Sequence, residues 1–198
     1  DAGWGIGGPS RYLATSYDCT IDAIELTPEF VDVARDLNAL VGLEDRIHVV
    51  VGSVTDLPYE DASFDAILCQ NVTMNVADKT TMFSEACRTL KPGGIYAVSH
   101  VAEGPVRDPI YPLPWAMDAR SSFLGSPAEI LGLLEDAGFH DVHDHMADAT
   151  VNPGGAPQPG AIGPIPAMGD DMPERLGNVV RSLEEGRLVS MMITASKV

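Results

Sequence analysis

The chain has 198 residues and a mass of 21.0 kDa, which suits one domain with a sizeable hydrophobic core. Its 12 Lys and Arg residues against 29 Asp and Glu residues give a formal net charge of −17, so a phosphate backbone would be repelled and no nucleic-acid partner is expected. No apolar run reaches the length of a membrane span and no signal peptide is recognisable, so we expect no membrane partner either. We therefore expect a globular protein that acts on a small molecule.

The cysteines bear on the cellular compartment. Cys19, Cys69 and Cys87 are odd in number, widely spaced and set in apolar stretches. This pattern is typical of buried free thiols, which suit a reducing environment. We predict a cytoplasmic protein, either a monomer or a homodimer.

A glycine-rich loop, DAGWGIGGP, opens the chain. Gly3, Gly5 and Gly7 allow positive φ angles and let a ligand lie against the backbone with no Cβ in the way. Pro9 fits the first turn of a helix that follows the loop. We therefore expect the loop to cradle a ligand.

A strand and an acidic residue come next. Residues 19–24 have the pattern of a short buried strand, which ends at Glu25. An acidic side chain about 20 residues after a glycine-rich turn is placed to hold a ribose diol. Two ligand classes carry such a ribose: dinucleotides, whose G-x-G-x-x-G pattern Gly3, Gly5 and Gly8 satisfy, and S-adenosylmethionine. Glycine spacing alone leaves both open.

The rest of the chain alternates between helix and strand patterns, which predicts a parallel α/β sheet with its ligands at the carboxyl ends of the strands. Glu25, Ser53, Gln70 and His100 all fall at such ends. Helices are predicted near residues 28–41, 78–90 and 126–138, and strands over residues 47–51, 64–69, 95–99, 141–146 and 188–196.

Two further stretches are predicted to lie on the substrate side, residues 101–125 and residues 152–173. The second is rich in Pro and Gly, and these residues interrupt it too often for a helix to form. Long loops in compact domains are usually functional or disordered. We therefore expect a lid over the substrate or a disordered insertion.

The order of these motifs resembles the class I S-adenosylmethionine-dependent methyltransferases. The run D-x-G-x-G-x-G-G-P looks like motif I of that family, and residues 52–59, 63–65 and 90–94 resemble it in order and spacing. The stretches that look most like bacterial small-molecule enzymes, of the sarcosine/dimethylglycine N-methyltransferase and tocopherol or quinone C-methyltransferase type, are residues 7–14, 68–71 and 124–127.

The resemblance implies the fold. It predicts a single methyltransferase domain over residues 1–198, an α/β Rossmann-like three-layer sandwich with a mostly parallel seven-stranded sheet. The chain begins at the acid of motif I, without the apolar strand that leads into it in the family. We therefore expect the first strand to be missing and the sequence to lack an N-terminal segment.

The resemblance also implies S-adenosylmethionine as the cofactor. Asp1 and the backbone of Gly3, Gly5 and Gly7 would hold its methionyl part. Glu25 would accept hydrogen bonds from the ribose hydroxyls.

The adenine and the transferring methyl have their own candidates. Leu26 would pack on the adenine ring. Ser53 stands where many relatives have Asp and carries no charge, so the Val54 amide is expected to contribute there. Gln70 would lie under the methionyl group and the methyl.

Methyl transfer is an in-line displacement from a sulfonium, and positioning in a dry site can supply most of the rate. An amine nucleophile needs no proton removed by the protein, whereas a phenol or carbon nucleophile would be helped by a histidine. The catalytic candidates are His100, as a base, and Gln70. A hydrogen-bonded structural histidine is the alternative for His100.

The acceptor pocket is expected to include Asn71, Met74, Tyr111 and Trp115, although the last three also suit a hydrophobic core. No metal is expected, because the reaction needs none. A metal site and a solvated polar edge both fit the cluster of His140, His143 and His145.

These observations predict a methyltransferase that acts on a small-molecule acceptor, with an amine favoured. A C- or O-methyltransferase of a quinone, phenol or natural product is the alternative within the family. A nicotinamide-dependent oxidoreductase and a non-catalytic cofactor-binding protein are the alternatives from other classes.

Overall fold

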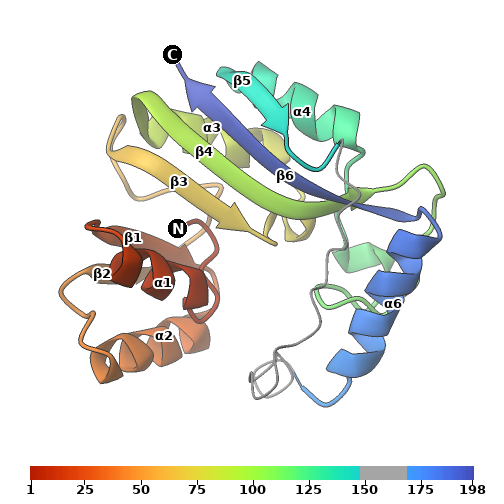
Figure 1. Ribbon diagram of the computed structural model, residues 1–198, viewed down its shortest axis with the longest axis horizontal. Helices are drawn as coiled ribbons and strands as arrows, with labels where there is room; N and C mark the ends of the chain where they lie inside the picture. The colour runs from red at the N-terminus through yellow and green to blue at the C-terminus, as the bar shows by residue number, and fades with distance from the viewer. Residues whose placement is uncertain (148–168) are drawn as a thin grey trace.

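A computed structural model of the chain describes residues 1–147 and 169–198 as a mixed α/β fold (Figure 1). The helices are α1 (Gly8–Ser16), α2 (Pro28–Leu40), α3 (Lys79–Thr89), α4 (Pro127–Asp136) and α6 (Met172–Glu184), with two 3-10 turns, η1 (Thr73–Asn75) and η2 (Ala119–Ser121). The strands are β1 (Ile21–Glu25), β2 (Ile47–Val51), β3 (Phe64–Gln70), β4 (Leu90–Glu103), β5 (Phe139–Asp144) and β6 (Leu188–Lys197).

The sheet differs from the prediction, although the α/β class is correct. Within the described residues the six strands form two sheets, a parallel pair β1-β2 and a four-stranded sheet in the order β3-β4-β6-β5. Strand β3 runs parallel to β4, but β6 runs antiparallel to both β4 and β5. The reason lies in the path of the chain: β6 starts beside the end of β4, where Leu188 pairs with Glu103, and must therefore run back along it. A mostly parallel seven-stranded sheet is not what the described residues form.

The first residues of the chain connect the two sheets. The Ala2 amide donates to the Leu68 carbonyl of β3 at 2.8 Å, and the Ile24 amide of β1 donates to the Asp1 carbonyl at 3.0 Å. Gly3 in turn donates to the Ile24 carbonyl at 2.9 Å. These bonds bring the carboxyl ends of β1 and β3 together. Further back along the two strands a cavity of about 430 Å³ separates them.

Two hydrophobic clusters stabilise these layers. One joins α1 and α2 to the β1-β2 pair and includes Trp4, Val31 and Ile47. The larger one lies between the four-stranded sheet and the helices α3 and α4. There Phe139 stacks on Tyr96 with ring centroids 5.3 Å apart. Each sheet thus buries a face against its own helices.

Helix α4 begins as the sequence predicts. The Ser126 hydroxyl accepts from the Glu129 amide at 3.3 Å, and the Glu129 carboxylate accepts from the Ser126 amide at 2.9 Å. This reciprocal capping box satisfies two amides that the helix itself leaves free.

Helix α6 is the main element that the sequence analysis missed. The Pro- and Gly-rich stretch of residues 152–173 was expected to contain no helix, but α6 begins at Met172 with Pro173 in its first turn. Proline is tolerated at this position because its missing amide would have no partner there. The lid predicted over residues 152–173 lies mostly within residues 148–168, which are outside the described residues. Residues 101–103 belong to strand β4, and the remainder of the 101–125 stretch forms loops and η2.

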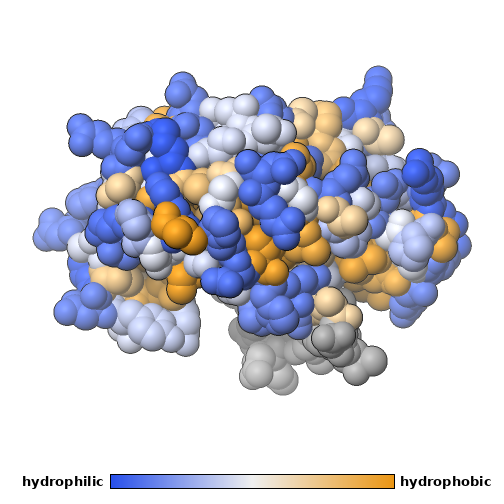
Figure 2. Space-filling model, turned by 90° about the horizontal axis from the view of Figure 1, so that it is seen from above, coloured by the Kyte–Doolittle hydropathy of each residue, from blue (hydrophilic) through white to orange (hydrophobic). Residues whose placement is uncertain are grey.

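The surface agrees with the high content of acidic residues. Hydrophilic side chains cover much of the face seen from above, with smaller apolar groups between them (Figure 2). No helix of the described ranges combines the length and the apolar character needed to cross a membrane. Cys19, Cys69 and Cys87 are free thiols.

Candidate active site

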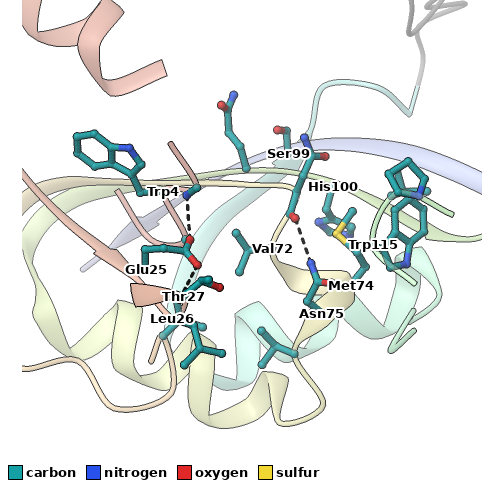
Figure 3. Close-up of a pocket in the computed structure, with 18 of the residues that line it drawn as sticks. Trp4, Glu25, Leu26, Thr27, Val72, Met74, Asn75, Ser99, His100 and Trp115 are labelled. Atoms are coloured by element: carbon teal, nitrogen blue, oxygen red, sulfur yellow. Dashed lines mark hydrogen bonds between the residues drawn. The ribbon is translucent and has the colours of Figure 1, made fainter. Parts of the chain in front are cut away.

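The glycine-rich loop and Glu25 form one hydrogen-bonded unit (Figure 3). Glu25 ends strand β1, and its carboxylate accepts from the Gly5 amide at 2.9 Å and from the Thr27 amide at 2.9 Å. Each of the two bonds uses a different oxygen of the carboxylate. Glu25 therefore fixes the loop that precedes α1 to the start of α2.

The three predicted loop glycines all have positive φ angles, 84° at Gly3, 60° at Gly5 and 80° at Gly7. A Cβ at Gly7 would lie 1.8 Å from the Trp4 ring, and one at Gly3 would lie 2.2 Å from a methyl of Val72. A Cβ at Gly5 would meet no protein atom within 4 Å. Gly3 and Gly7 are thus required by packing, whereas Gly5 leaves open space for a ligand.

A cavity of about 1230 Å³ opens at the carboxyl ends of β1, β3 and β4. Glu25, Gln70 and His100 lie at or near these ends, which is where open α/β sheets bind their ligands. We call the part around Trp4, Gly5, Glu25 and Thr27 the cofactor end.

The opposite part of the cavity is formed by different elements. Figure 3 shows Met74, His100 and Trp115 together, across Val72 from Trp4 and Glu25. Helix α6 belongs to this side and is joined to the loop that carries Trp115, since Asn178 donates to the Pro112 carbonyl at 3.0 Å. We call this part the acceptor end; it comprises Met74, His100, Trp115 and the lining residues of α6, Met172, Leu176, Val179 and Leu183.

Most of the predicted site residues meet in this one cavity. Those that line it are Gly3, Gly5, Glu25, Leu26, Ser53, Val54, Gln70, Asn71, Met74, His100 and Trp115.

Asp1, Gly7 and Tyr111 are placed elsewhere. The Asp1 carboxylate accepts from the Ser10 hydroxyl at 2.5 Å and lines the smaller cavity between β1 and β3. The role expected for Asp1, which is to hold the methionyl part of the cofactor, stays a prediction; in the structure its carboxylate faces α1. Gly7 lies against the Trp4 ring, and Tyr111 is half-buried outside the cavity lining.

His100 is buried at the acceptor end, with 3% of its surface exposed. Neither ring nitrogen has a hydrogen-bond partner among residues 1–147 and 169–198. Burial, together with the nearby Lys79 ammonium, lowers the pKa of His100 from 6.5 to about 4, and Asp144 opposes the shift. The imidazole is therefore neutral at neutral pH and can donate one hydrogen bond and accept another.

Several lining residues were missed from the sequence. Trp4 and Thr27 lie at the cofactor end, and Met191 of β6 borders the cavity farther along. On α6, Leu176, Val179 and Leu183 recur three and four residues apart, a helical spacing that was readable in the sequence. This spacing was not recognised because a Pro- and Gly-rich stretch, which is unfavourable for helices, comes directly before it.

The histidine cluster at β5 forms contacts of its own. The rings of His143 and His145 meet edge to face with centroids 4.5 Å apart, and His145 shares a 2.8 Å hydrogen bond with Thr194. Within residues 1–147 and 169–198, no three His, Cys, Asp or Glu side chains are grouped in a way that could hold a metal ion.

Comparison with known proteins identifies the family of this site. Residues 1–98, which carry the glycine-rich loop, Glu25 and Gln70, match the family described as "Methyltransferase domain". Residues 1–98 belong to this family. Its members depend on S-adenosylmethionine, and structural neighbours of the chain have been solved with this cofactor or with S-adenosylhomocysteine.

Individual relatives are small-molecule methyltransferases. The glycine/sarcosine/dimethylglycine N-methyltransferase of Actinopolyspora halophila is 37% identical over 94 residues, 48% of this chain and 17% of the relative. The sarcosine/dimethylglycine N-methyltransferase of Halorhodospira halochloris is 30% identical over 149 residues, 73% of this chain and 53% of the relative. The chain therefore spans about half or less of the length of these curated relatives.

The fold has solved counterparts as well. The geranyl diphosphate C-methyltransferase of Streptomyces coelicolor A3(2), solved with Mg2+, geranyl diphosphate and S-adenosylhomocysteine, has a TM-score of 0.75 at 20% sequence identity. The comparison covers 100% of this chain and 70% of that one. This similarity confirms the methyltransferase type of α/β fold.

Proposed function

We propose that this protein transfers a methyl group from S-adenosylmethionine to a small-molecule acceptor. The observation that carries the proposal is the unit of Gly5 and Glu25 at the head of a large cavity at the strand ends. The same glycine pattern and Glu25 also suit a nicotinamide cofactor. Family membership over residues 1–98 favours methyl transfer.

The residues present fit the cofactor. The backbone at Gly5 faces space in which a side chain would meet no protein atom, so a ligand can approach the main chain there. The Glu25 carboxylate is the group to accept hydrogen bonds from the ribose diol, and it is preorganised by its two backbone donors. Leu26, Ser53 and Val54 form the adenine side of the same cavity in this proposal.

When bound, S-adenosylmethionine supplies a methyl group on a sulfonium, a good leaving group. Gln70 and Asn71, at the end of β3, orient the methionyl part and the methyl. The acceptor enters from the acceptor end, where Met74 and Trp115 exclude water. His100 offers the acceptor a neutral hydrogen-bonding group rather than a charge.

The acceptor atom is part of the proposal. Curated relatives are named for N-methylation of glycine, sarcosine and dimethylglycine, which favours nitrogen. An amine that attacks as the free base needs no proton removed by the protein beforehand. Oxygen or carbon atoms of quinone, phenol or natural-product acceptors are the alternative.

The three free cysteines support a reducing compartment such as the cytoplasm, as part of the same proposal.

The test is an incubation of the protein with S-adenosylmethionine that carries a trideuterated methyl group, together with a metabolite extract of the source organism. Mass spectrometry should find a labelled product and S-adenosylhomocysteine in equal amounts. If the cofactor binds but no metabolite gains the label, the protein binds its cofactor without catalysis.

A further inference from the structure

We propose that the methyl acceptor has a large apolar body and no negative charge, and is neither a small amino acid nor a phosphate ester. The inference rests on the proposed function and specifies its substrate class. It comes from the charges, the size and the lining of the acceptor end.

The cavity offers no cation to an acidic acceptor. All 12 Lys and Arg residues of the chain lie in the described ranges, and none of them lines the cavity. The charged side chains in its described lining are Glu25 and Asp78, both acidic. Residues 148–168 contain no Lys, Arg or His, so that stretch of sequence has no cation to add. A carboxylate or a phosphate would therefore lose its hydration without gaining an ionic partner.

Two cations are sequence neighbours of lining residues, and both are already engaged. Arg175 forms an ion pair with Asp171 at 2.6 Å. The other cation is Lys79. It donates to the Val76 carbonyl at 2.7 Å and also to the Phe123 carbonyl. Its surface is only 8% exposed. These two bonds fix the loop around Phe123 to α3, and turning the ammonium toward a ligand would leave both carbonyls without this donor.

The lining of the acceptor end is apolar. Met74 and Met172 are almost fully buried there, and Leu176, Val179 and Leu183 present one face of α6 to the cavity. Methionine adapts its shape to irregular apolar ligands. A ligand there would meet mainly apolar side chains. Among the residues that define the acceptor end, one side chain has polar atoms without a partner in the described part of the chain.

That side chain is His100. Both of its ring nitrogens lack a partner in the described part of the chain, although only 3% of the residue is exposed. A buried polar group without a partner is costly, so a ligand that hydrogen-bonds to it gains binding energy. Lys79 and Asp144 are the charged groups that influence it, and neither bonds to the ring. A single hydroxyl or amino group on an otherwise apolar acceptor could form a hydrogen bond with one of the two ring nitrogens of His100.

The size of the cavity points in the same direction. A pocket for one drug-sized ligand has a volume of roughly 300–1,000 Å³. The observed volume of about 1230 Å³ exceeds that range and suits a cofactor beside a second ligand of substantial size. Sarcosine or glycine would leave most of the acceptor end unfilled.

The first test measures binding to the protein saturated with S-adenosylhomocysteine, using 1-naphthol and 1-naphthoate as probes of similar shape and different charge. Calorimetry should show 1-naphthol binding at least about tenfold more tightly than 1-naphthoate, because only the anion must be desolvated without a partner. Equal binding, tighter binding of 1-naphthoate, or no binding of 1-naphthol would overturn the inference.

A variant sharpens this test. Leu176 lines the acceptor end but is 39% exposed, so L176R should fold, with L176Q as the uncharged control. L176R should reverse the preference in favour of 1-naphthoate, whereas L176Q should keep 1-naphthol ahead. An unchanged preference in L176R would contradict the placement of the acceptor beside α6.

The second test uses turnover. A metabolite extract is divided into an organic and an aqueous fraction, and each is incubated with the protein and the deuterated cofactor. The label should appear in the organic fraction, and sarcosine and phosphoethanolamine should gain none. Saturable labelling of either compound would overturn the inference while leaving the proposed function intact. Failure to bind S-adenosylhomocysteine would instead defeat the proposed function itself.

Discussion

The Glu25 carboxylate accepts a hydrogen bond from the Gly5 amide at 2.9 Å across 20 residues of sequence. This bond places the acidic end of β1 directly against the backbone that a cofactor must approach. The same carboxylate therefore organises the loop and remains the polar group at the cofactor end of the cavity.

Glu25→Ala should weaken the binding of S-adenosylhomocysteine about 10- to 150-fold, since charge-assisted hydrogen bonds contribute about 1.5–3 kcal/mol. Isothermal titration calorimetry measures the change. Glu29→Ala removes an exposed carboxylate from the first turn of α2 and serves as the matched control for charge. Equal losses in both variants would mean that Glu25 acts through the overall field and not through contact.

Gly7→Ala should destabilise the fold by at least about 2 kcal/mol, because a Cβ would collide with the Trp4 ring and φ is 80°. A loss of that size lowers the melting temperature by roughly 4–8 °C in a domain of this length. Gly8→Ala is the control, since Gly8 has no neighbour within 4 Å of a Cβ and begins α1. Gly8→Ala should melt at or slightly above the temperature of the wild type. Similar losses in both variants would contradict this packing.

Gly5→Val should mainly reduce cofactor binding, whereas Gly7→Ala should mainly reduce folding stability. No protein atom lies within 4 Å of a Cβ at Gly5, so the folding penalty should come from the positive φ of 60° and the branched side chain. The loss of S-adenosylhomocysteine binding should exceed that of Glu25→Ala, because the side chain would fill the space meant for the ligand. Binding within threefold of the wild type would show that the cofactor does not approach the loop here.

His100 should make folding stability depend on pH. Its pKa is lowered from 6.5 to about 4 by burial, so between these values the unfolded chain binds a proton that the folded chain does not. The contribution is present in full above pH 6.5 and is lost as the pH falls toward 4, a change of about 3 kcal/mol. Denaturation of the wild type and of His100→Leu over this range should show a shallower loss of stability in the variant. Identical pH dependence would exclude a buried neutral His100.

Dialysis against EDTA should leave methyl transfer unchanged, because the sulfonium needs no Lewis acid to release the methyl group. The labelled-product assay measures it before and after treatment. If activity disappeared and zinc restored it, the cluster of His140, His143 and His145 would have to be reconsidered as a metal site.

The sequence predicted what local patterns encode. The loop glycines, Glu25 and Gln70 are identified by spacing, because turn geometry and strand ends depend on neighbours along the chain. The helix predicted over residues 126–138 corresponds to α4, which begins at the capping box of Ser126 and Glu129. Of the four residues that define the cofactor end, these patterns identify Gly5 and Glu25, and their roles toward the cofactor stay predictions.

Features that depend on distant partners could not be predicted. The antiparallel course of β6 follows from its pairing with β4, more than 80 residues earlier in the sequence, which periodicity does not reveal. The Asp1 side chain turns to Ser10 because that hydroxyl lies beside it only once α1 has folded. The spacing of apolar residues in the sequence indicates the apolar face of α6. The position of this helix at the acceptor end, however, depends on contacts such as that of Asn178 with Pro112.

The most direct test of the account is a calorimetric titration of the protein with S-adenosylhomocysteine and, separately, with NAD+. The account predicts saturable one-to-one binding of S-adenosylhomocysteine that Glu25→Ala weakens, and no comparable binding of NAD+. Tight binding of NAD+ without binding of S-adenosylhomocysteine would contradict it.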